Sequence, residues 1–259
     1  MFETLEIVRD GGVATVWMNR PERHNAFNAT VIAELTRAFT DLSEEAGVRV
    51  VVLAGRGKSF SAGADLAWMK AAGEASLEEN LADARRLADM LGRLADCPKP
   101  TIARVHGAAL GGGMGLAAAC DLCIASDSAS FATSEVRFGL IPSAIGPYVL
   151  RAIGRRQASR WFLTAERITA AKALDIGLAH EVVAADALDA AIEAQVKLLL
   201  GGGPHAQAEA KRLIRDIPAN RIDAEVAEET ARRIAHLRMG AEAREGLSAF
   251  LEKRSPQWS

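Results

Sequence analysis

Short apolar runs alternate with helical periodicity through the first half of the chain, and this alternation limits the possible folds more than any other feature. Three apolar runs predict strands, and they are Val48–Ala54, Thr101–Val105 and Leu122–Ala125. The first is densely β-branched, which is typical of a strand buried on both faces, and the second predicts a short buried strand. Helical spacing of apolar residues predicts one helix from Asn28 or Thr30 to about Glu45 and another over Leu77–Leu94. Alternation of this kind predicts an α/β fold with a largely parallel sheet and right-handed crossovers.

The two ends of the chain differ from this pattern. Leu5–Val8 and Val13–Met18 flank an Asp-Gly-Gly turn, which predicts a β-hairpin. From about residue 146 helical patterns dominate, and the last of them are rich in Ala, Glu and Arg and too polar to form a core of their own. We therefore expect a core over residues 1–200 and a helical region over 201–259 that packs on the core and on other subunits.

Charge and hydropathy exclude several classes of protein. The 259 residues carry 31 Lys+Arg and 33 Asp+Glu, so a protein that holds nucleic acid by bulk charge is excluded. The longest apolar run, Ala108–Cys120, is interrupted by glycines and is shorter than the roughly 20 residues that a membrane-spanning helix needs. The N-terminus shows no apolar segment of the secretory type. We expect a cytoplasmic protein without a membrane or nucleic-acid partner.

Three cysteines, Cys97, Cys120 and Cys123, form an odd and sparse set with no second CxxC pair and no nearby His cluster. This pattern favours buried, reduced thiols over a redox or metal site. We expect no metal and no separate cofactor.

Two glycine-rich loops carry the candidate chemistry, and each directly follows a predicted buried strand. They are Lys58–Leu66 and His106–Leu116, of which the second leads into an apolar helix. Glycine lets the backbone approach a ligand, and a helix N-terminus offers unpaired N–H groups. Two such N–H groups from separate loops can hold one oxygen that becomes negative during a reaction, an arrangement typically worth about 3–4 kcal/mol per donor.

The same glycine loops also fit simpler or different roles. A glycine-rich turn before a helix is often only a tight connection between a strand and a helix. Dinucleotide binding is disfavoured, because no acidic residue ends a following strand at the Rossmann spacing. A P-loop is excluded, because the pattern GxxxxGK[ST] is missing.

Five segments together resemble the crotonase, or enoyl-CoA hydratase/isomerase, superfamily, and the resemblance extends over essentially the whole chain. The segments are Asn19–Phe27, Phe60–Leu66, His106–Gly113, Ala119–Leu122 and Phe131–Pro142. In this order and at this spacing they are specific to the superfamily but much less specific to one reaction. The resemblance implies a spiral of ββα units followed by a helical C-terminal trimerisation region. It also implies an acyl-CoA substrate and self-association into homotrimers or hexamers.

The resemblance also implies roles for individual residues. The backbone N–H groups of Ala64 and Gly112 would hold the thioester oxygen of an enolate-like intermediate. The CoA-binding set it implies comprises Arg23, Ala26, Ala62, Ala64, Asp65, Leu66, Gly112, Phe250 and Lys253. Within this set, Phe250 and Lys253 would reach CoA from the C-terminal helix, in the same or in a neighbouring subunit. For Arg23 and Lys253 the alternative is an ordinary solvated surface charge.

Hydratases of this superfamily typically use two glutamates, and this sequence has only one of them. Glu135 stands at the second position, whereas Gly115 stands at the first. A carboxyl in a small apolar pocket has a raised pKa, which suits proton transfer, so we expect Glu135 to be the catalytic acid/base. The alternative is a salt bridge with Arg137. If the segment is a strand, however, the two side chains lie on opposite faces.

Three functions fit this pattern. The first is an enoyl-CoA hydratase that adds water across the 2,3 double bond. The segment Ser134–Val149 resembles bacterial methylglutaconyl-CoA and isohexenylglutaconyl-CoA hydratases. The resemblance implies that Gly also stands at the position of Gly115 in that subgroup. Substrates of that subgroup carry an extra carboxylate, which would position water or be held by an Arg. The second is a Δ3-Δ2 enoyl-CoA isomerase, because one base suffices to move a proton between two carbons. The third is a catalytically weak acyl-CoA-binding protein.

Five further residues are candidates for lining the acyl pocket, and residues of these types are more often part of the core. They are Trp68, Met69, Met114, Ile145 and Tyr148.

Overall fold

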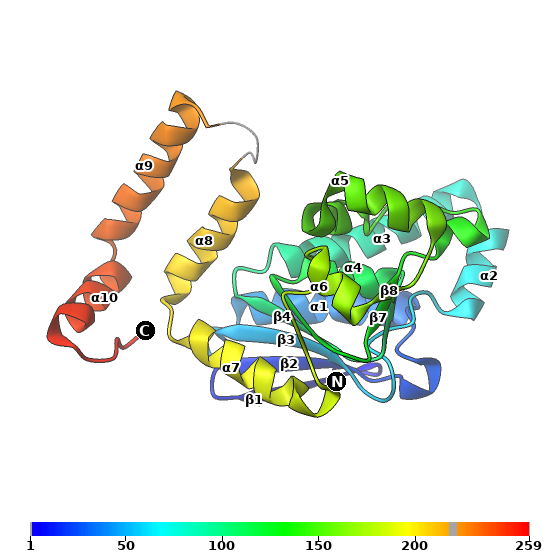
Figure 1. Cartoon of the computed structure of the whole chain (residues 1–259), viewed down its shortest axis with the longest axis horizontal. Coiled ribbons are helices and arrows are strands. Elements are labelled where there is room, and N and C mark those ends of the chain that lie inside the picture. Colours follow the sequence, from blue (N-terminus) through cyan, green and yellow to red (C-terminus); the bar gives the residue numbers. More distant parts are fainter. Residues whose placement is uncertain (1, 218–221, 259) are drawn as a thin grey trace.

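The computed structural model describes residues 2–217 and 222–258 of the chain. Its main sheet has six strands in the order β1-β2-β3-β4-β6-β9 (Figure 1). The strands are β1 (Leu5–Asp10), β2 (Val13–Met18), β3 (Val50–Gly55), β4 (Thr101–Val105), β6 (Leu122–Ser126) and β9 (Glu181–Val183). Strands β1 and β2 form the predicted hairpin, and every other neighbouring pair is parallel. The predicted α/β fold is confirmed.

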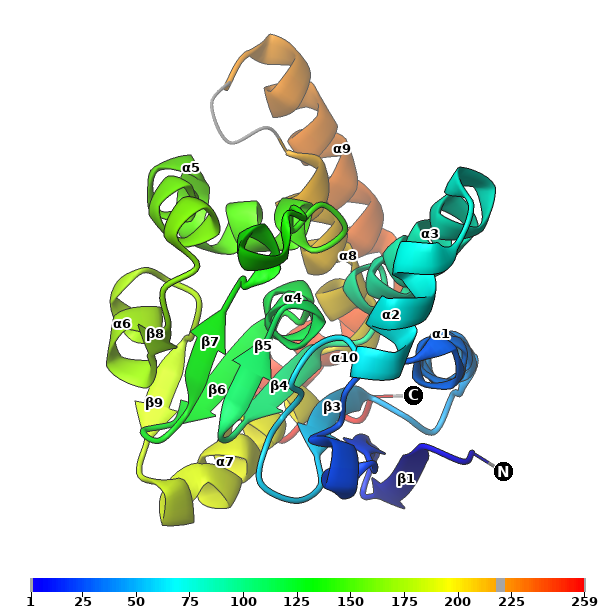
Figure 2. The same cartoon turned by 90° about the vertical axis from the view of Figure 1, so that its right-hand side faces the viewer.

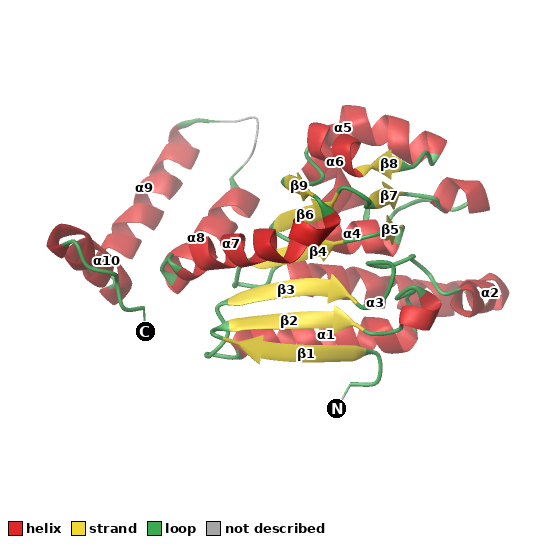
Figure 3. Cartoon of the chain, turned by 60° about the horizontal axis from the view of Figure 1, so that its bottom comes forward, coloured by secondary structure: helices red, strands yellow, loops and turns green. Residues whose placement is uncertain are grey.

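Helices cover both faces of this sheet, as Figure 3 shows for α1 on one face and α7 on the other. Strand β3 explains how one run of apolar residues serves both layers, since its side chains alternate between the faces. Val51 and Leu53 belong to the large core under α1 and α3, whereas Val50 and Val52 pack with Leu188 of α7. The helices that precede the C-terminal region are α1 (Ala29–Glu44), α2 (Leu66–Glu74), α3 (Leu77–Ala95), α4 (Gly112–Ala119), α5 (Gly146–Thr164), α6 (Ala170–Asp175) and α7 (Leu188–Leu200).

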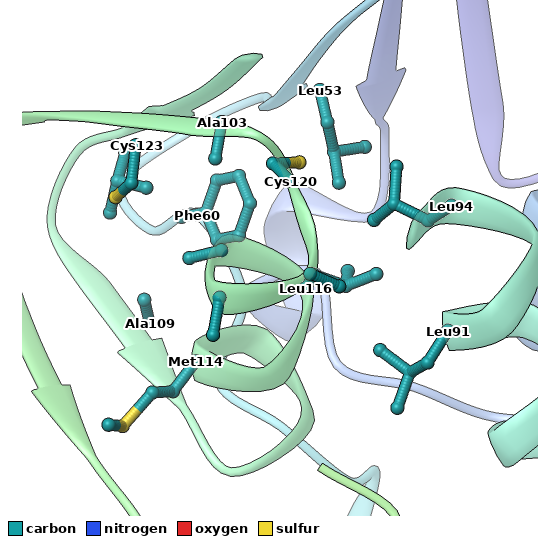
Figure 4. Close-up of a cluster of buried hydrophobic side chains, with 14 of the residues drawn as sticks. Leu53, Phe60, Leu91, Leu94, Ala103, Ala109, Met114, Leu116, Cys120 and Cys123 are labelled. Carbon is teal, nitrogen blue, oxygen red and sulfur yellow. The ribbon is translucent and has the colours of Figure 1, made fainter. Parts of the chain in front are cut away.

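Helix α4 lies inside the molecule. All of its residues after Gly112 are buried, which only a run of Gly, Ala and Leu without charges allows. In Figure 4 its Met114 and Leu116 lie among the side chains of Phe60, Leu91 and Ala109. In Figure 2 it lies between α5 on one side and α2 and α3 on the other. Small side chains let its backbone come close to these neighbours.

A second sheet of three short strands was not predicted. It consists of β5 (Ala108–Leu110), β7 (Ser130–Ala132) and β8 (Ile168–Thr169), in that order. Strands of two or three residues are too short to show a period-two pattern. The helix α2 and the strand β9 were also missed.

The C-terminal helices extend away from the sheets (Figure 1). They are α8 (Pro204–Asp216), α9 (Ala224–Met239) and α10 (Ala241–Glu252). Helix α8 is tied to the core by Lys211, whose Nζ lies 2.6 Å from Asp121 Oδ2 and 2.9 Å from the carbonyl oxygen of Lys99. Large apolar side chains such as Ile214, Met239 and Phe250 are exposed on these helices. The division of the chain at residue 200, where α7 ends, stays a prediction.

Within the described ranges, none of the helices has both the length and the hydropathy to cross a bilayer.

Candidate active site

The short second sheet places the two predicted centres of chemistry beside each other. Strands β5 and β7 pair in parallel, with Leu110 opposite Ala132, so the chain leaves both strands at the same edge. Gly111 follows β5, and its N–H donates to the carbonyl oxygen of Ala132 at 2.8 Å. Glu135 begins the 3₁₀ helix η2 (Glu135–Phe138) three residues after β7. Glu135 is thereby brought to the N-terminus of α4.

The first glycine loop is attached to this edge by backbone hydrogen bonds. Ser61 pairs with Ala109 of β5, and its N–H and carbonyl oxygen bond to Ala108 and Leu110 at 3.0 and 2.9 Å. Gly63 has a φ of 88°, and a Cβ there would lie 2.8 Å from the carbonyl oxygen of Leu110. Glycine therefore permits both the left-handed turn and the close approach of the two loops.

Two backbone N–H groups at this junction are free. In the part of the chain that the structure describes, the N–H groups of Ala64 and Gly112 donate to no protein acceptor. Gly112 is the first residue of α4, and a Cβ there would lie 2.4 Å from a ring carbon of Phe27. Free donors on adjacent loops are what an oxyanion hole requires, so the geometry is compatible with the predicted role of both residues.

Glu135 is a half-buried carboxyl with one unsatisfied oxygen. Its Oε2 is fully buried and has no hydrogen-bond partner, and its Oε1 lies 3.4 Å from the place where a Cβ on Gly111 would stand. Burial raises the pKa of Glu135, and the residue's own backbone N–H opposes this only in part. A buried carboxyl of raised pKa beside free N–H groups is typical of a general acid/base.

Glu135 and Arg137 lie in a 3₁₀ helix and not in a strand, so the expectation that the pleat of a sheet separates their side chains is wrong. Arg137 is nevertheless exposed, and Glu135 forms no ion pair with any residue in the described ranges. A salt bridge therefore does not explain Glu135.

The place of the missing glutamate is occupied. A Cβ on Gly115 would lie 2.2 Å from Cγ2 and 2.7 Å from Cβ of Ile145, which is almost fully buried. No side chain fits at position 115 unless Ile145 moves. Ile145 was predicted only as one of several pocket or core residues, and a lone Ile gives no sequence signal for this contact.

Arg20, which was not predicted as a site residue, connects two of the predicted CoA-binding residues, Ala26 and Asp65. Arg20 donates to the carbonyl oxygen of Ala26 at 2.7 Å, and its guanidinium lies 3.1 Å from a carboxylate oxygen of Asp65. Asp65 also caps α2 by accepting from the N–H of Ala67 at 2.9 Å. Although burial raises it, the Ala67 N–H and the Arg20 guanidinium hold the pKa of Asp65 below its usual range.

The other predicted CoA-binding residues near these loops differ in exposure. Arg23 is exposed in the 3₁₀ helix η1 (Pro21–Arg23), and Ala62 and Ala64 are partly buried. Leu66 begins α2 and is 82% exposed, although it is a large apolar residue. An apolar side chain of this kind at the mouth of the site offers a contact to a ligand or to another chain.

Phe250 and Lys253 are not brought to this site within one chain. Helix α10 and the residue that follows it lie at the opposite end of the molecule from α2 in both Figure 1 and Figure 3. Binding of CoA by these two residues stays a prediction. Phe250 is 80% exposed.

Two cavities lie elsewhere in the molecule. One of about 440 Å³ lies at the other end of α4, between Cys120, Arg151 and Lys211. A second of about 560 Å³ lies at Trp17, Arg56 and His106. Neither is lined by Glu135, Ala64 or Gly112.

The three cysteines are buried and free of disulfides, as predicted. Burial raises the pKa of Cys123 to about 12, which makes it a poor nucleophile and metal ligand. Among the described residues, no group of His, Cys, Asp and Glu side chains has the geometry of a metal site.

Comparison with known proteins agrees with this geometry. Residues 9–259 match the family described as enoyl-CoA hydratase/isomerase. An enoyl-CoA hydratase from Shewanella pealeana has a structure with a TM-score of 0.96 and 43% identity, covering 99% of this chain and 96% of that one. The enoyl-CoA hydratase of Mycobacterium smegmatis gives a TM-score of 0.91 at 39% identity over 99% of both chains. The 2,3-dehydroadipyl-CoA hydratase of Escherichia coli is 34% identical over 257 residues, 98% of each chain.

A parallel α/β core with these glycine loops, matched over nearly its full length by such relatives, defines the crotonase class of protein. The chain belongs to the enoyl-CoA hydratase/isomerase family. Its activity is that of an enoyl-CoA hydratase, a hydro-lyase, and the predicted family and enzyme class are confirmed.

Proposed function

We propose that the chain hydrates the 2,3 double bond of an acyl-CoA with Glu135 as its only acid–base group. The Glu135 carboxylate takes a proton from water while the water oxygen bonds to C3 of the acyl group. The electron pair of the double bond moves onto the thioester oxygen, where the N–H groups of Ala64 and Gly112 stabilise the negative charge. The protonated Glu135 then delivers a proton to C2, which completes the addition.

One observation supports this mechanism above the others. The buried Oε2 of Glu135 has no hydrogen-bond partner, although an unsatisfied buried carboxyl oxygen is costly. A substrate water is a natural partner for this atom. The free N–H groups of Ala64 and Gly112 lie on the loops that adjoin it.

The substrate we propose is a branched acyl-CoA of the 3-methylglutaconyl type, with a carboxylate at the far end of the acyl group. The resemblance of residues 134–149 to hydratases of such substrates supports this choice. A relative named for 2,3-dehydroadipyl-CoA, which is also the thioester of a dicarboxylic acid, agrees with it. The second carboxylate of the substrate would position the water in a site where the protein itself lacks a second carboxylate.

CoA is proposed to bind along Arg23, Ala26, Ala62, Asp65 and Leu66, with Phe250 and Lys253 supplied by a neighbouring chain of a homotrimer or hexamer. The near-zero net charge of the chain means that a few placed cations, and not the overall field, must bind the CoA phosphates. No cofactor is required besides the CoA of the substrate.

A Δ3-Δ2 enoyl-CoA isomerase activity is the second candidate. It is favoured by the apolar contact between Gly115 and Ile145, which leaves a single carboxyl at the site. One base that removes a proton from C2 and returns it to C4 would need no second acid.

A panel of three substrates tests the proposal: crotonyl-CoA, a 3-enoyl-CoA and 3-methylglutaconyl-CoA, each followed for hydration and for migration of the double bond. We expect hydration to dominate and kcat/KM to be highest for 3-methylglutaconyl-CoA. Preference for the 3-enoyl substrate would overturn the hydratase proposal in favour of the isomerase. Binding of acyl-CoA without turnover of any of the three would indicate a binding protein.

A further inference from the structure

We propose that Ile145 is a positioning residue that takes the place of the second catalytic carboxylate and makes Glu135 the sole proton-transfer group. This inference rests on the proposed role of Glu135. It concerns a residue that neither the motifs nor the comparisons single out.

Gly111 and Gly115 lie one helical turn apart at the start of α4. The N–H of Gly115 donates to the carbonyl oxygen of Gly111 at 3.0 Å, which is an α-helical bond. Residues four apart in a helix lie about 6 Å apart along its axis. Gly111 is the N-cap of α4, with a φ of 49° and a ψ of −118°, so its Cβ direction is not that of a helical residue. A Cβ on Gly111 would point to Oε1 of Glu135 at 3.4 Å, and a Cβ on Gly115 would point to Cγ2 of Ile145 at 2.2 Å. Glu135 therefore lies beside the N-cap of α4, and Ile145 lies against Gly115 about one turn further along the helix.

Ile145 cannot easily leave this place. It is 3% exposed and precedes α5, where its carbonyl oxygen accepts from the N–H groups of Tyr148 and Val149, both at 3.1 Å. Its Cβ would lie only 2.7 Å from a Cβ at position 115, so rotating the side chain does not remove the clash. Any side chain at position 115 requires the start of α5 to shift. A glutamate cannot be restored there by a single substitution.

With glycine at position 115, α4 offers Glu135 no second carboxylate. Ile145 offers no donor or acceptor, and β5 and α4 contain no charged residue. Arg137 on η2 is exposed, and Asp65 on the first glycine loop is paired with Arg20. Among the described residues, no charged side chain thus neutralises the Glu135 carboxylate or shares its proton. Both proton transfers must pass through this one carboxyl.

The test is a double-mutant cycle with Gly115→Glu, Ile145→Gly and the combination of both. Gly115→Glu alone should lower Tm strongly and lower kcat/KM for crotonyl-CoA at least tenfold, because of the clash. Ile145→Gly alone should lower Tm by opening a cavity. The double variant should have a higher Tm than Gly115→Glu and should hydrate crotonyl-CoA at least tenfold faster than either single variant.

Two further readouts separate positioning from packing. The pH profile of kcat/KM should gain a second carboxyl ionisation in the double variant, because two adjacent carboxyls titrate as a coupled pair. Gly73→Ala in α2 is a matched control, because a Cβ there meets no atom within 4 Å. This variant should keep Tm and kcat/KM at or above the wild-type values.

The proposal is overturned if Gly115→Glu alone keeps the wild-type Tm, or if the effects on Tm of the two single variants simply add. It is also overturned if the double variant folds but its activity and pH profile stay those of Ile145→Gly. If Glu135→Gln retains activity while the Tm values are non-additive, the proposed role of Glu135 fails and the blocking contact stands.

Discussion

Glu135 is the residue at which burial and charge are in conflict. A carboxylate prefers water, yet one oxygen of this side chain is buried without a partner and the pKa is raised as a result. Unsatisfied groups of this kind persist in native proteins mainly where function requires them. The free-energy cost of burying this oxygen without a partner is offset by the packing of the two sheets and the helices that hold η2 beside α4.

Glu135→Gln removes the ionisable group and keeps nearly the same volume. We expect kcat for enoyl-CoA hydration to fall by about 10²–10⁴ while binding of the acyl-CoA persists, since proton transfer contributes about that factor. Steady-state kinetics combined with calorimetric titration of a substrate analogue checks this. Arg137→Gln on the same 3₁₀ helix is the matched control and should stay near wild type, because its side chain is exposed. Retention of more than a tenth of kcat by Glu135→Gln would contradict the prediction.

The raised pKa of Glu135 also predicts how stability depends on pH. A carboxyl whose pKa is higher in the folded than in the unfolded state favours folding at low pH, and this contribution is lost as pH rises through the folded-state pKa. Near neutral pH we expect the Tm of Glu135→Gln to exceed that of wild type, because the wild-type carboxylate is then charged in a partly buried place. The difference should shrink as the pH falls toward 4, below the ordinary carboxyl pKa of 4.5. Calorimetry at fixed protein concentration from pH 4 to 8 measures it, and an unchanging difference would contradict the prediction.

At the scale of single residues, the sequence predicted what its motifs encode and missed what only packing reveals. The glycine loops predicted that N–H groups from two loops could converge, and the family resemblance implied Ala64, Gly112 and Glu135 in particular. The fold brings the two loops and Glu135 together. Arg20 was missed, and Ile145 was predicted only as a pocket or core candidate and not as the residue in contact with Gly115. A surface-type Arg and a lone Ile carry no periodic signal, and their importance depends on Asp65 and Gly115, which are distant in the chain.

At the scale of elements, the site depends on β5 and β7, which are three residues long each. Their parallel pairing fixes the N-terminus of α4 against η2. The longer elements were predicted well because burial imposes a clear pattern on them. Of the two predicted starts of α1, Asn28 and Thr30, Asn28 is the cap, and it accepts from the N–H of Val31 at 2.9 Å. The short strands are stabilised by neighbours in the fold and not by local propensity, so the sequence does not reveal them.

The N-terminus of α4 offers a prediction at this scale. Gly112→Ala would place a Cβ 2.4 Å from the ring of Phe27 and push the first turn of α4 away from the first glycine loop. We expect kcat to fall by about 10²–10³, as it does when one donor of an oxyanion hole is lost. Gly92→Ala in α3 is the control, because a Cβ there meets only Tyr148 Oη at 3.9 Å, and its helix should gain up to about 1 kcal/mol. Wild-type kcat in Gly112→Ala would argue against a role for this backbone group.

At the scale of the whole molecule, the C-terminal helices carry large apolar side chains that their own chain leaves exposed. Phe250 and Leu251 on α10 are 80% and 79% exposed, and Met239 at the end of α9 is 75% exposed. At the other end of the molecule Leu66, Phe138 and Ile141 are exposed around the mouth of the candidate site. Exposed apolar side chains at both ends are typical of a closed symmetric assembly in which one end of each chain covers the other end of the next.

This arrangement predicts complementation between two defective variants. Lys253→Ala should raise KM for the acyl-CoA and Glu135→Gln should abolish turnover, so each homo-oligomer is impaired. In oligomers reassembled from equal amounts of the two variants, some sites combine an intact Glu135 from one chain with an intact Lys253 from another. If chains assemble at random, about a quarter of all sites are of this kind. We therefore expect the mixture, assayed at a substrate concentration below the KM of Lys253→Ala, to exceed the mean activity of the two parents. Light scattering checks that the mixture forms an oligomer. The control mixture combines Glu135→Gln with Arg37→Ala, a substitution of an exposed residue on α1, in place of Lys253→Ala. Activity no higher than the parental mean would place Lys253 outside the neighbouring site.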